Sequence, residues 1–343
     1  MRRAVASSAE AQLDELFASA RQSPNPVLSS LEPTIRESKH ISMDMEKLRE
    51  AAATIPAEKV QPADWTFPPY KPGNDEKTVD FFMLMNSINF LFFDPQTMEK
   101  YKVQVKDKEF TGADGMVASL NRALDEGKPM LDAEYLASIS KEDMAHIFRG
   151  NIELPLLEER RQIFHEVGRV LQDKYDGSFS NMVKASGGKA FDEGNGMVER
   201  LTRDFPSFRD EADGAVFNKR AQLAVGMLTS RLAGTGEFDT PDVDQLTVFA
   251  DYQLPRGLRA LGVLNYGDEL AERVDNGRPI EKGSQMEKEL RAYTIVASEL
   301  LMKEMRKRPG FEKLDARGLD SYLWSTARKD KNSKPHITIT TAY

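Results

Sequence analysis

The amino-acid sequence predicts a mainly α-helical protein, a single globular domain of many helices with a small β element. Apolar residues recur every three or four positions along most of the longer segments, which is the period of an amphipathic helix. No segments alternate as strand, helix and strand, so a doubly wound parallel sheet is not indicated. With 343 residues, of which 40% are hydrophobic, the chain is long enough to bury a large core.

The N-terminal part predicts short helices that are followed by a cluster of prolines. In the first expected helix, Met1–Gln22, Leu13 and Phe17 lie one turn apart. A second and a third helix of low hydrophobicity are expected within Glu32–Ala57. The prolines of Pro62–Pro72 then predict an extended connection, whose aromatic residues we expect to pack on the main body. We therefore divide the chain into a partly flexible helical extension, residues 1–64, and a main domain, residues 65–343.

The most hydrophobic stretch, Asp80–Phe93, predicts a helix that is buried on most sides. Asn86, Ser87 and Asn89 interrupt it, and it is shorter than the roughly 20 apolar residues that span a bilayer. The N-terminus also lacks the apolar segment of a secretory signal. Since cysteine is absent, disulfides and thiolate chemistry are excluded. We expect a cytoplasmic protein that does not enter a membrane.

Glycine and proline mark the ends of most of the remaining helices, as Gly127 does after Glu126. A hairpin is expected from Tyr101–Val105 and Glu109–Gly112, and a short strand from His336–Thr341, because polar and apolar residues alternate there. The other expected helices are Gly115–Glu126, Ser140–Phe148, Leu156–Tyr175, Ser180–Ala185, Gly194–Phe205, Phe217–Leu232, Asp242–Asp251, Pro255–Leu264, Gly267–Asn276, Ser284–Lys307 and Leu314–Lys329.

The charge balance favours a small anionic substrate over duplex nucleic acid. The formal net charge is -8, with 55 acidic and 47 basic residues. A protein that holds the phosphate backbone of a duplex usually presents a basic face. A small anionic ligand needs only one or two basic groups, and Lys219-Arg220 at the start of an expected helix supplies such a pair. Cations there oppose the helix dipole, which indicates an anionic partner; the alternative is a solvated first turn.

Several catalytic motifs can be rejected. Ser186–Ala190 lacks the first glycine, the hydroxyl residue after lysine and the preceding strand of a phosphate-binding loop. The four histidines are widely spaced, and none belongs to a pair with metal-ligand spacing. No Gly-x-Ser-x-Gly elbow occurs. We expect no metal and no cofactor, and the sequence carries no signal for an oligomeric state.

Two aspartates beside aromatic residues remain as candidates for carboxylate chemistry. Asp251 lies between Phe249 and Tyr252, and Pro255 predicts that a new helix begins four residues later. Asp251 is thus expected in a break between two elements, where a side chain can project into an active site. Asp320 is the second candidate. Taken alone, each is better explained as a surface or helix-capping aspartate.

Seven short motifs occur along the chain, in the order Asn89-Phe90, Asn121–Gly127, Pro155–Arg160, Phe205–Asp210, Lys219–Gln222, Phe249–Pro255 and Tyr322–Trp324. Together they resemble the queuosine salvage protein family, the queuosine 5′-phosphate N-glycosylase/hydrolases. The resemblance extends from about Phe81 to Tyr343. It implies a largely helical fold similar to helical DNA glycosylases. It also implies hydrolysis of queuosine 5′-monophosphate, which releases queuine for reinsertion into tRNA.

The resemblance also implies a role for individual residues. Asp251 matches the catalytic acid of the family, and a carboxylate there would stabilise the positive charge that develops on the ribose. Phe249 matches an aromatic residue that contacts the base. Asp320 matches the carboxylate that accepts hydrogen bonds from the guanine-like edge of queuine. Lys219 fits a contact to the 5′-phosphate.

Three further residues of the expected substrate site follow Asp320. Ser321 and Tyr322 adjoin it, and Ser325 stands where some family members carry a second acid, at the cyclopentene-diol arm of the base. The expected substrate is a free nucleotide and not intact tRNA, which agrees with the acidic net charge.

Two alternatives remain open at this point. A base-excision glycosylase of related fold would need a basic groove and would bind duplexes in a salt-dependent way. A non-enzymatic helical interaction protein would leave Asp251 and Asp320 facing solvent.

Overall fold

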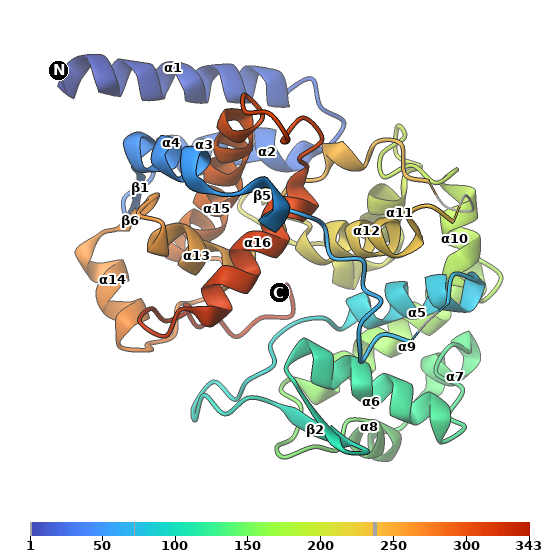
Figure 1. The fold of residues 1–343 in the computed structure, drawn as a ribbon. Coiled ribbons are helices and arrows are strands. Elements are labelled where there is room, and N and C mark those ends of the chain that lie inside the picture. Colours follow the sequence, from blue (N-terminus) through green and yellow to red (C-terminus); the bar gives the residue numbers. More distant parts are fainter. Residues whose placement is uncertain (1, 72, 236–238) are drawn as a thin grey trace. The chain divides into compact units, whose positions relative to one another are not determined.

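A computed structural model describes residues 2–71, 73–235 and 239–343 of the chain (Figure 1). The chain forms two compact units. The first contains the residues up to Ala63, Asp210–Lys219 and Asp242–Thr338. The second contains Asp64–Arg209, Arg220–Pro241 and Ile339–Tyr343. Helices dominate both, and the strands of the described residues form only two-stranded antiparallel pairs, so the expected mainly helical class is confirmed.

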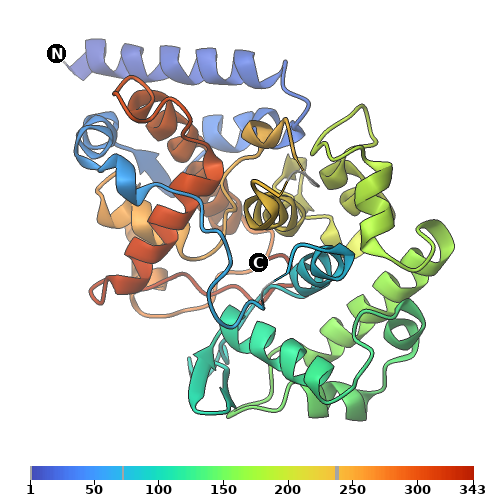
Figure 2. The ribbon, with the colours of Figure 1, turned by 45° about the vertical axis from the view of Figure 1, so that its right-hand side comes forward.

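The first unit is built around the long helix α15 (Gln285–Met305), most of whose residues are buried. The Ser284 hydroxyl accepts the N–H of Glu287 at the start of this helix. Helices from both ends of the chain pack on α15, as Figure 2 shows for the blue and red segments. The other elements of this unit are α1 (Arg2–Ala20), α2 (Pro26–Ser30), α3 (Glu32–Arg36), β1 (Ile41–Met43), α4 (Met45–Thr54), a 3₁₀ turn at Ala57–Lys59, β4 (Glu211–Ala212), β5 (Ala215–Val216), a 3₁₀ turn at Val243–Gln245, α13 (Leu254–Ala260), β6 (Leu264–Tyr266), α14 (Asp268–Asp275) and α16 (Ala316–Lys329).

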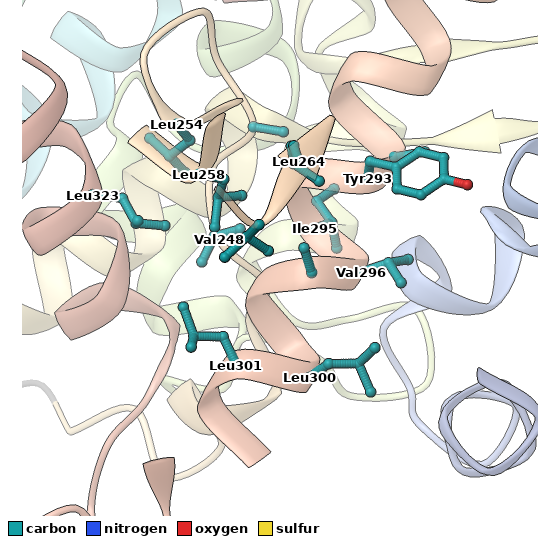
Figure 3. Packing of buried hydrophobic residues seen from close by; sticks show 14 of the residues in the cluster. Val248, Leu254, Leu258, Leu264, Tyr293, Ile295, Val296, Leu300, Leu301 and Leu323 are labelled. Atoms are coloured by element: carbon teal, nitrogen blue, oxygen red, sulfur yellow. The ribbon is translucent and has the colours of Figure 1, made fainter. Parts of the chain in front are cut away.

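The core of the first unit lies where α13, α15 and α16 meet. Figure 3 shows Leu258 of α13 and Leu323 of α16 beside Ile295 and Leu301 of α15, with Val248 from the loop before α13 among them. All five side chains are buried. Since Val248 is anchored in this core, the loop that carries Asp251 starts from a fixed point.

Two expectations for the first unit are wrong. The segment Asp242–Asp251 was expected to be a helix, but it forms only the 3₁₀ turn Val243–Gln245 and continues as irregular backbone. After this turn, the N–H of Phe249 and the carbonyl of Ala250 bond to side chains of α16 and α15, as described below. The expected strand His336–Thr341 is irregular as well, although the Ile337 carbonyl accepts the N–H of Ile280 at 2.7 Å.

The pairing of β1 with β6 was not predicted from the sequence. Ser42 pairs with Asn265, and the flanking N–H groups of Asp44 and Gly267 bond to Val263 and His40. We had placed residues 41–43 among the helices of Glu32–Ala57. A three-residue strand whose partner lies far along the chain has no local signal, so only the tertiary structure defines it.

The second unit contains the hydrophobic stretch at Asp80 and the expected hairpin. Val103 pairs with Phe110, which confirms the hairpin. Residues 133–138 form a helix that the sequence analysis missed. The elements are α5 (Glu76–Ser87), β2 (Lys102–Val105), β3 (Lys108–Thr111), α6 (Ala113–Asp125), α7 (Ala133–Ser138), α8 (Lys141–Ile147), α9 (Leu157–Lys174), α10 (Phe179–Ala185), α11 (Met197–Asp204), a 3₁₀ turn at Pro206–Phe208 and α12 (Lys219–Leu232) after its first residue.

Helix α5 ends at Ser87, six residues before the expected end at Phe93. The buried guanidinium of Arg160 donates hydrogen bonds to the carbonyls of Ile88, Phe90 and Leu91. Because Arg160 satisfies these carbonyls, they need no hydrogen-bond donors from a further turn of helix. The hydrophobic stretch therefore continues after Ser87 as irregular buried backbone.

Of the aromatic residues of the proline cluster, Tyr70 packs on the rest of the second unit, as expected, whereas Phe67 is exposed. Tyr70 stacks on Phe82 of α5 with ring centroids 5.8 Å apart. Arg231 of α12 donates to the carbonyls of Trp65 and Lys71, both at 2.8 Å. Pro72 lies outside the described residues. The division into an extension of residues 1–64 and a main domain of residues 65–343 stays a prediction. Within the described residues, no helix combines the length and the apolar character needed to cross a membrane.

Candidate active site

The candidate residues of the sequence analysis all belong to the first unit. Lys219 is the first residue of α12. Phe249 and Asp251 belong to the loop that precedes α13. Asp320 lies on α16, together with Ser321, Tyr322 and Ser325.

The Asp251 side chain is held at the beginning of α13. Its Oδ1 accepts the N–H groups of Gln253 at 2.7 Å and of Leu254 at 3.0 Å, an Asx-type turn that leads into the helix. Pro255 occupies the first turn, where a missing N–H costs nothing. Asp251 therefore lies in a break between elements, as the proline pattern predicted, and its side chain is directed inward, with the residue only 8% exposed.

Asp320 connects α16 to the same loop. Its Oδ2 accepts the backbone N–H of Phe249 at 2.8 Å. This bond joins Oδ2 of Asp320 to the loop, so that Oδ1 can accept hydrogen bonds from other donors. The loop can stay irregular because α16 supplies an acceptor that a helical Phe249 would otherwise find in its own backbone.

The charges of Asp251, Asp320 and Lys219 act on one another. Burial raises the pKa of Asp251, and the positive charge of Lys219 and the two backbone N–H groups oppose that rise. Burial and the negative charge of Asp251 raise the pKa of Asp320 to about 8, against the Phe249 N–H and Lys219. At pH 7 Asp320 is therefore mostly protonated, and the two carboxyl groups differ in environment.

Lys219 and Arg220, the basic pair of the sequence analysis, have different surroundings. The backbone N–H of Lys219 donates to Asp210 Oδ2 at 3.1 Å, and its side-chain charge acts on both candidate carboxyl groups. Arg220 donates to the carbonyls of Ser87 and Ser207. Arg220 thus stabilises backbone within the second unit, whereas Lys219 belongs to the carboxylate cluster.

The remaining three residues share α16 with Asp320 but have other contacts. The Ser325 hydroxyl donates to the Tyr322 carbonyl at 3.1 Å, within the helix. Tyr322 packs against the hydrophobic cluster of the first unit. Ser321 and Ser325 lie one turn apart and so share a face of α16. The structure thus brings Lys219, Phe249, Asp251 and Asp320 together. The other three candidates, Ser321, Tyr322 and Ser325, lie beside Asp320 on α16.

Two residues that contact this cluster were missed by the sequence analysis. Arg291 of α15 and Asp210 form a buried ion pair, with Nη1 and Nη2 at 2.7 and 2.5 Å from the carboxylate oxygens. Arg291 Nε also donates to the carbonyl of Ala250 at 3.3 Å. The available signal was Arg291 itself, which directly precedes the largely apolar segment Ala292–Ala297 of an expected helix. A charge that is buried there requires a partner.

Comparisons with known proteins identify the family of the chain. The sequence model of the family described as queuosine salvage protein matches residues 70–343. A protein of Sphaerobacter thermophilus named queuosine 5′-phosphate N-glycosylase/hydrolase is 33% identical over 309 residues, 88% of this chain and 92% of the relative. The protein of the same name from Mus musculus is 35% identical over 270 residues, 76% of this chain and 79% of the relative.

Proposed function

The chain belongs to the queuosine salvage protein family, and we propose that it hydrolyses the N-glycosidic bond of queuosine 5′-phosphate, with Asp251 as the catalytic carboxylate. The activity expected from the sequence is the one in the names of its relatives. The observation that supports the assignment to Asp251 is its environment: a buried carboxylate whose charge interacts with Lys219 and Asp320. A glycosidase needs such a negative charge next to a developing cation.

The proposed reaction adds one water molecule across the bond between ribose C1′ and the base nitrogen. As this bond breaks, its electron pair leaves with the base and positive charge develops on C1′ and the ring oxygen. The Asp251 carboxylate stabilises that charge and accepts a proton from the attacking water. The water oxygen bonds to C1′, and the departing base nitrogen takes up a proton from solvent. Asp251 returns the proton that it accepted to solvent, which restores the carboxylate. The products are ribose 5-phosphate and queuine.

Asp320 and Phe249 are proposed to bind the base. The ring of Phe249 offers an apolar surface for it, and the carboxylate of Asp320 accepts hydrogen bonds from the guanine-like edge. That role requires ionised Asp320, whose pKa of about 8 leaves it mostly protonated in the free protein. Donors of the base favour the ionised form, so binding of the base is coupled to release of a proton from Asp320.

Lys219 is proposed to bind the 5′-phosphate. Its ammonium is the cation that interacts with both candidate carboxylates, and the start of α12 adds the partial positive charge of a helix N-terminus. A phosphate placed there would neutralise Lys219 and leave Asp251 to act on the ribose. Ser321, Tyr322 and Ser325 remain candidates for contacts to the rest of the base.

The direct test is incubation of the purified protein with queuosine 5′-monophosphate, with queuine followed by mass spectrometry. We expect release of queuine and of ribose 5-phosphate in equal amounts. A protein that binds the nucleotide without releasing queuine would contradict the proposed activity.

The two alternatives are not favoured. An interaction protein would leave both acids facing solvent, whereas Asp251 is buried and Asp320 bonds to the backbone of Phe249. A base-excision glycosylase should bind duplex nucleic acid more weakly as salt increases. Absence of salt-dependent duplex binding would remove this second alternative. The cytoplasmic location stays a prediction.

A further inference from the structure

Arg291 and Asp210 form a buried ion pair inside the first unit. Arg291 is 2% exposed and Asp210 is 6% exposed. Removal of both charges from water costs free energy, and apolar residues of similar volume often give the same or a higher stability than such a pair. Net stabilisation is therefore a weak explanation for the pair, and the backbone groups that it holds suggest a better one.

Asp210 holds the beginning of α12. Its backbone carbonyl accepts the N–H of Phe217 at 2.8 Å, which closes the short hairpin of β4 and β5. Its carboxylate oxygen Oδ2 accepts the N–H of Lys219 at 3.1 Å. The backbone of Lys219 is therefore fixed relative to the Asp210 carboxylate.

Arg291 holds the loop of Asp251. While Nη1 and Nη2 bind Asp210, Nε donates to the carbonyl of Ala250, the residue immediately before Asp251. Glu287, one turn earlier on α15, lies 3.8 Å from Nη1, and the guanidinium lies 4.1 Å from the ring centre of Phe217. The planar guanidinium is thus held in one orientation, with different nitrogens directed at the two parts of the site.

We propose that the Arg291–Asp210 pair is a positioning pair, which sets the backbone of Asp251 and of Lys219 at a fixed separation. The inference rests on the proposed function, in which Asp251 acts at the ribose and Lys219 binds the phosphate of the same nucleotide. A rigid link between them places C1′ at the carboxylate when the phosphate is bound. Catalysis is sensitive to such placement, since an error of about 1 Å can lower the rate about 10²-fold.

The test compares two isosteric changes of buried carboxylates. In Asp210→Asn an NH₂ group replaces one of the two carboxylate oxygens. This group cannot accept a hydrogen bond, so it faces another donor, either the guanidinium of Arg291 or the N–H of Lys219. The matched control is Glu289→Gln on α15, because Glu289 is also fully buried and accepts the N–H groups of Lys39 and His40 at 2.8 and 2.7 Å. Both variants lose a buried carboxylate that accepts backbone N–H groups, and only Asp210 contacts the site.

We expect Asp210→Asn to lower kcat for queuosine 5′-monophosphate about 10²-fold. The ratio of kcat/KM for the monophosphate to that for the unphosphorylated nucleoside should fall as well, because Lys219 is displaced. Glu289→Gln should lower Tm to a similar extent and leave kcat and this ratio within about twofold of the wild type. Wild-type kcat and ratio in Asp210→Asn, or equal losses in Glu289→Gln, would overturn the proposal.

Arg291→Lys separates position from charge. The lysine keeps the positive charge near Asp251 but cannot bind a carboxylate with two nitrogens while it donates to Ala250. We expect kcat in this variant to be below that of the wild type, as in Asp210→Asn. Full activity would reduce the role of Arg291 to its charge and overturn the positioning role.

Hydrogen exchange gives a measurement that does not depend on the substrate. Amides in peptides that cover residues 215–220 and 247–254 should exchange faster in Asp210→Asn than in the wild type and in Glu289→Gln. Unchanged exchange in both peptides would overturn the proposal. If the wild type releases no queuine, the proposed function fails, and hydrogen exchange alone decides whether the pair holds the two segments.

Discussion

Gly257 of α13 lies so close to α16 that a Cβ atom on it would be 3.0 Å from the carbonyl oxygen of Leu323. This approach brings α16, which carries Asp320, against the helix that follows Asp251. The bond between Asp320 and the N–H of Phe249 depends on it, because the Asp320 carboxylate must reach the loop before α13. The small residue at position 257 thus helps to determine the geometry of the site.

Gly257→Ala should therefore impair both stability and activity. A Cβ at 3.0 Å from backbone forces α13 and α16 apart, and overpacking of this kind costs about 1–3 kcal/mol. Ala260→Gly on the exposed side of the same helix is the control, because it costs about 1 kcal/mol through helix propensity and leaves α16 in place. Thermal unfolding and kcat should both decrease in Gly257→Ala, and only Tm should decrease in the control. An unchanged kcat in Gly257→Ala would show that the spacing of the helices does not affect the reaction.

Asp251→Asn should abolish most of the release of queuine while the fold and nucleotide binding are retained. The amide can still accept the N–H groups of Gln253 and Leu254, but it carries no charge to stabilise the ribose cation or to accept a proton. Loss of a general base typically lowers kcat by about 10²–10⁴-fold. Single-turnover release of queuine measures the effect, and binding of the monophosphate by calorimetry is the control. Full activity would remove Asp251 from the catalytic role.

Lys219→Ala should raise KM for the monophosphate far more than KM for the unphosphorylated nucleoside. A hydrogen bond to a charged group contributes about 1.5–3 kcal/mol. The expected rise in KM for the monophosphate is thus about ten- to hundredfold. Steady-state kinetics with both substrates give the comparison. Equal effects on the two substrates would place the phosphate elsewhere.

Asp320→Asn should stabilise the protein more at pH 8 than at pH 5. The pKa of Asp320 is about 8 in the folded protein and about 3.9 in an unfolded chain. Between these values the unfolded state binds fewer protons than the folded state at this residue, so its contribution to stability decreases as pH rises. Asparagine removes this penalty and can still accept the N–H of Phe249.

Thermal unfolding at pH 5 and pH 8 tests the sign of this effect. Asp330→Asn is the control. Asp330 directly follows α16, and hydrogen bonds from Ser333 and Asn332 lower its pKa. Its carboxylate contributes stability above the unfolded pKa, so the asparagine variant should gain nothing as pH rises. The gain in Tm of Asp320→Asn over the wild type should grow with pH. A constant gain would contradict the raised pKa of Asp320.

Local patterns in the sequence predict most of the helices and the candidate site residues. Helical periodicity with a glycine or proline at the end predicted α9 and α15 to within one or two residues. Pro255 predicted the start of α13, and the break before it contains Asp251. These signals are local, because backbone propensity and one buried face act over a few residues. The resemblance in seven motifs then indicated the family and the candidate residues.

Where the helical patterns stop, and how the site is held together, depends on contacts between residues far apart in the chain. The segment before α13 is not helical because Asp320 and Arg291 bond to the backbone of Phe249 and Ala250. The pairing of β1 with β6 and the ion pair of Arg291 with Asp210 likewise join residues far apart in the chain. Such contacts are favourable only when packing has already brought both partners together, so no stretch of sequence contains them.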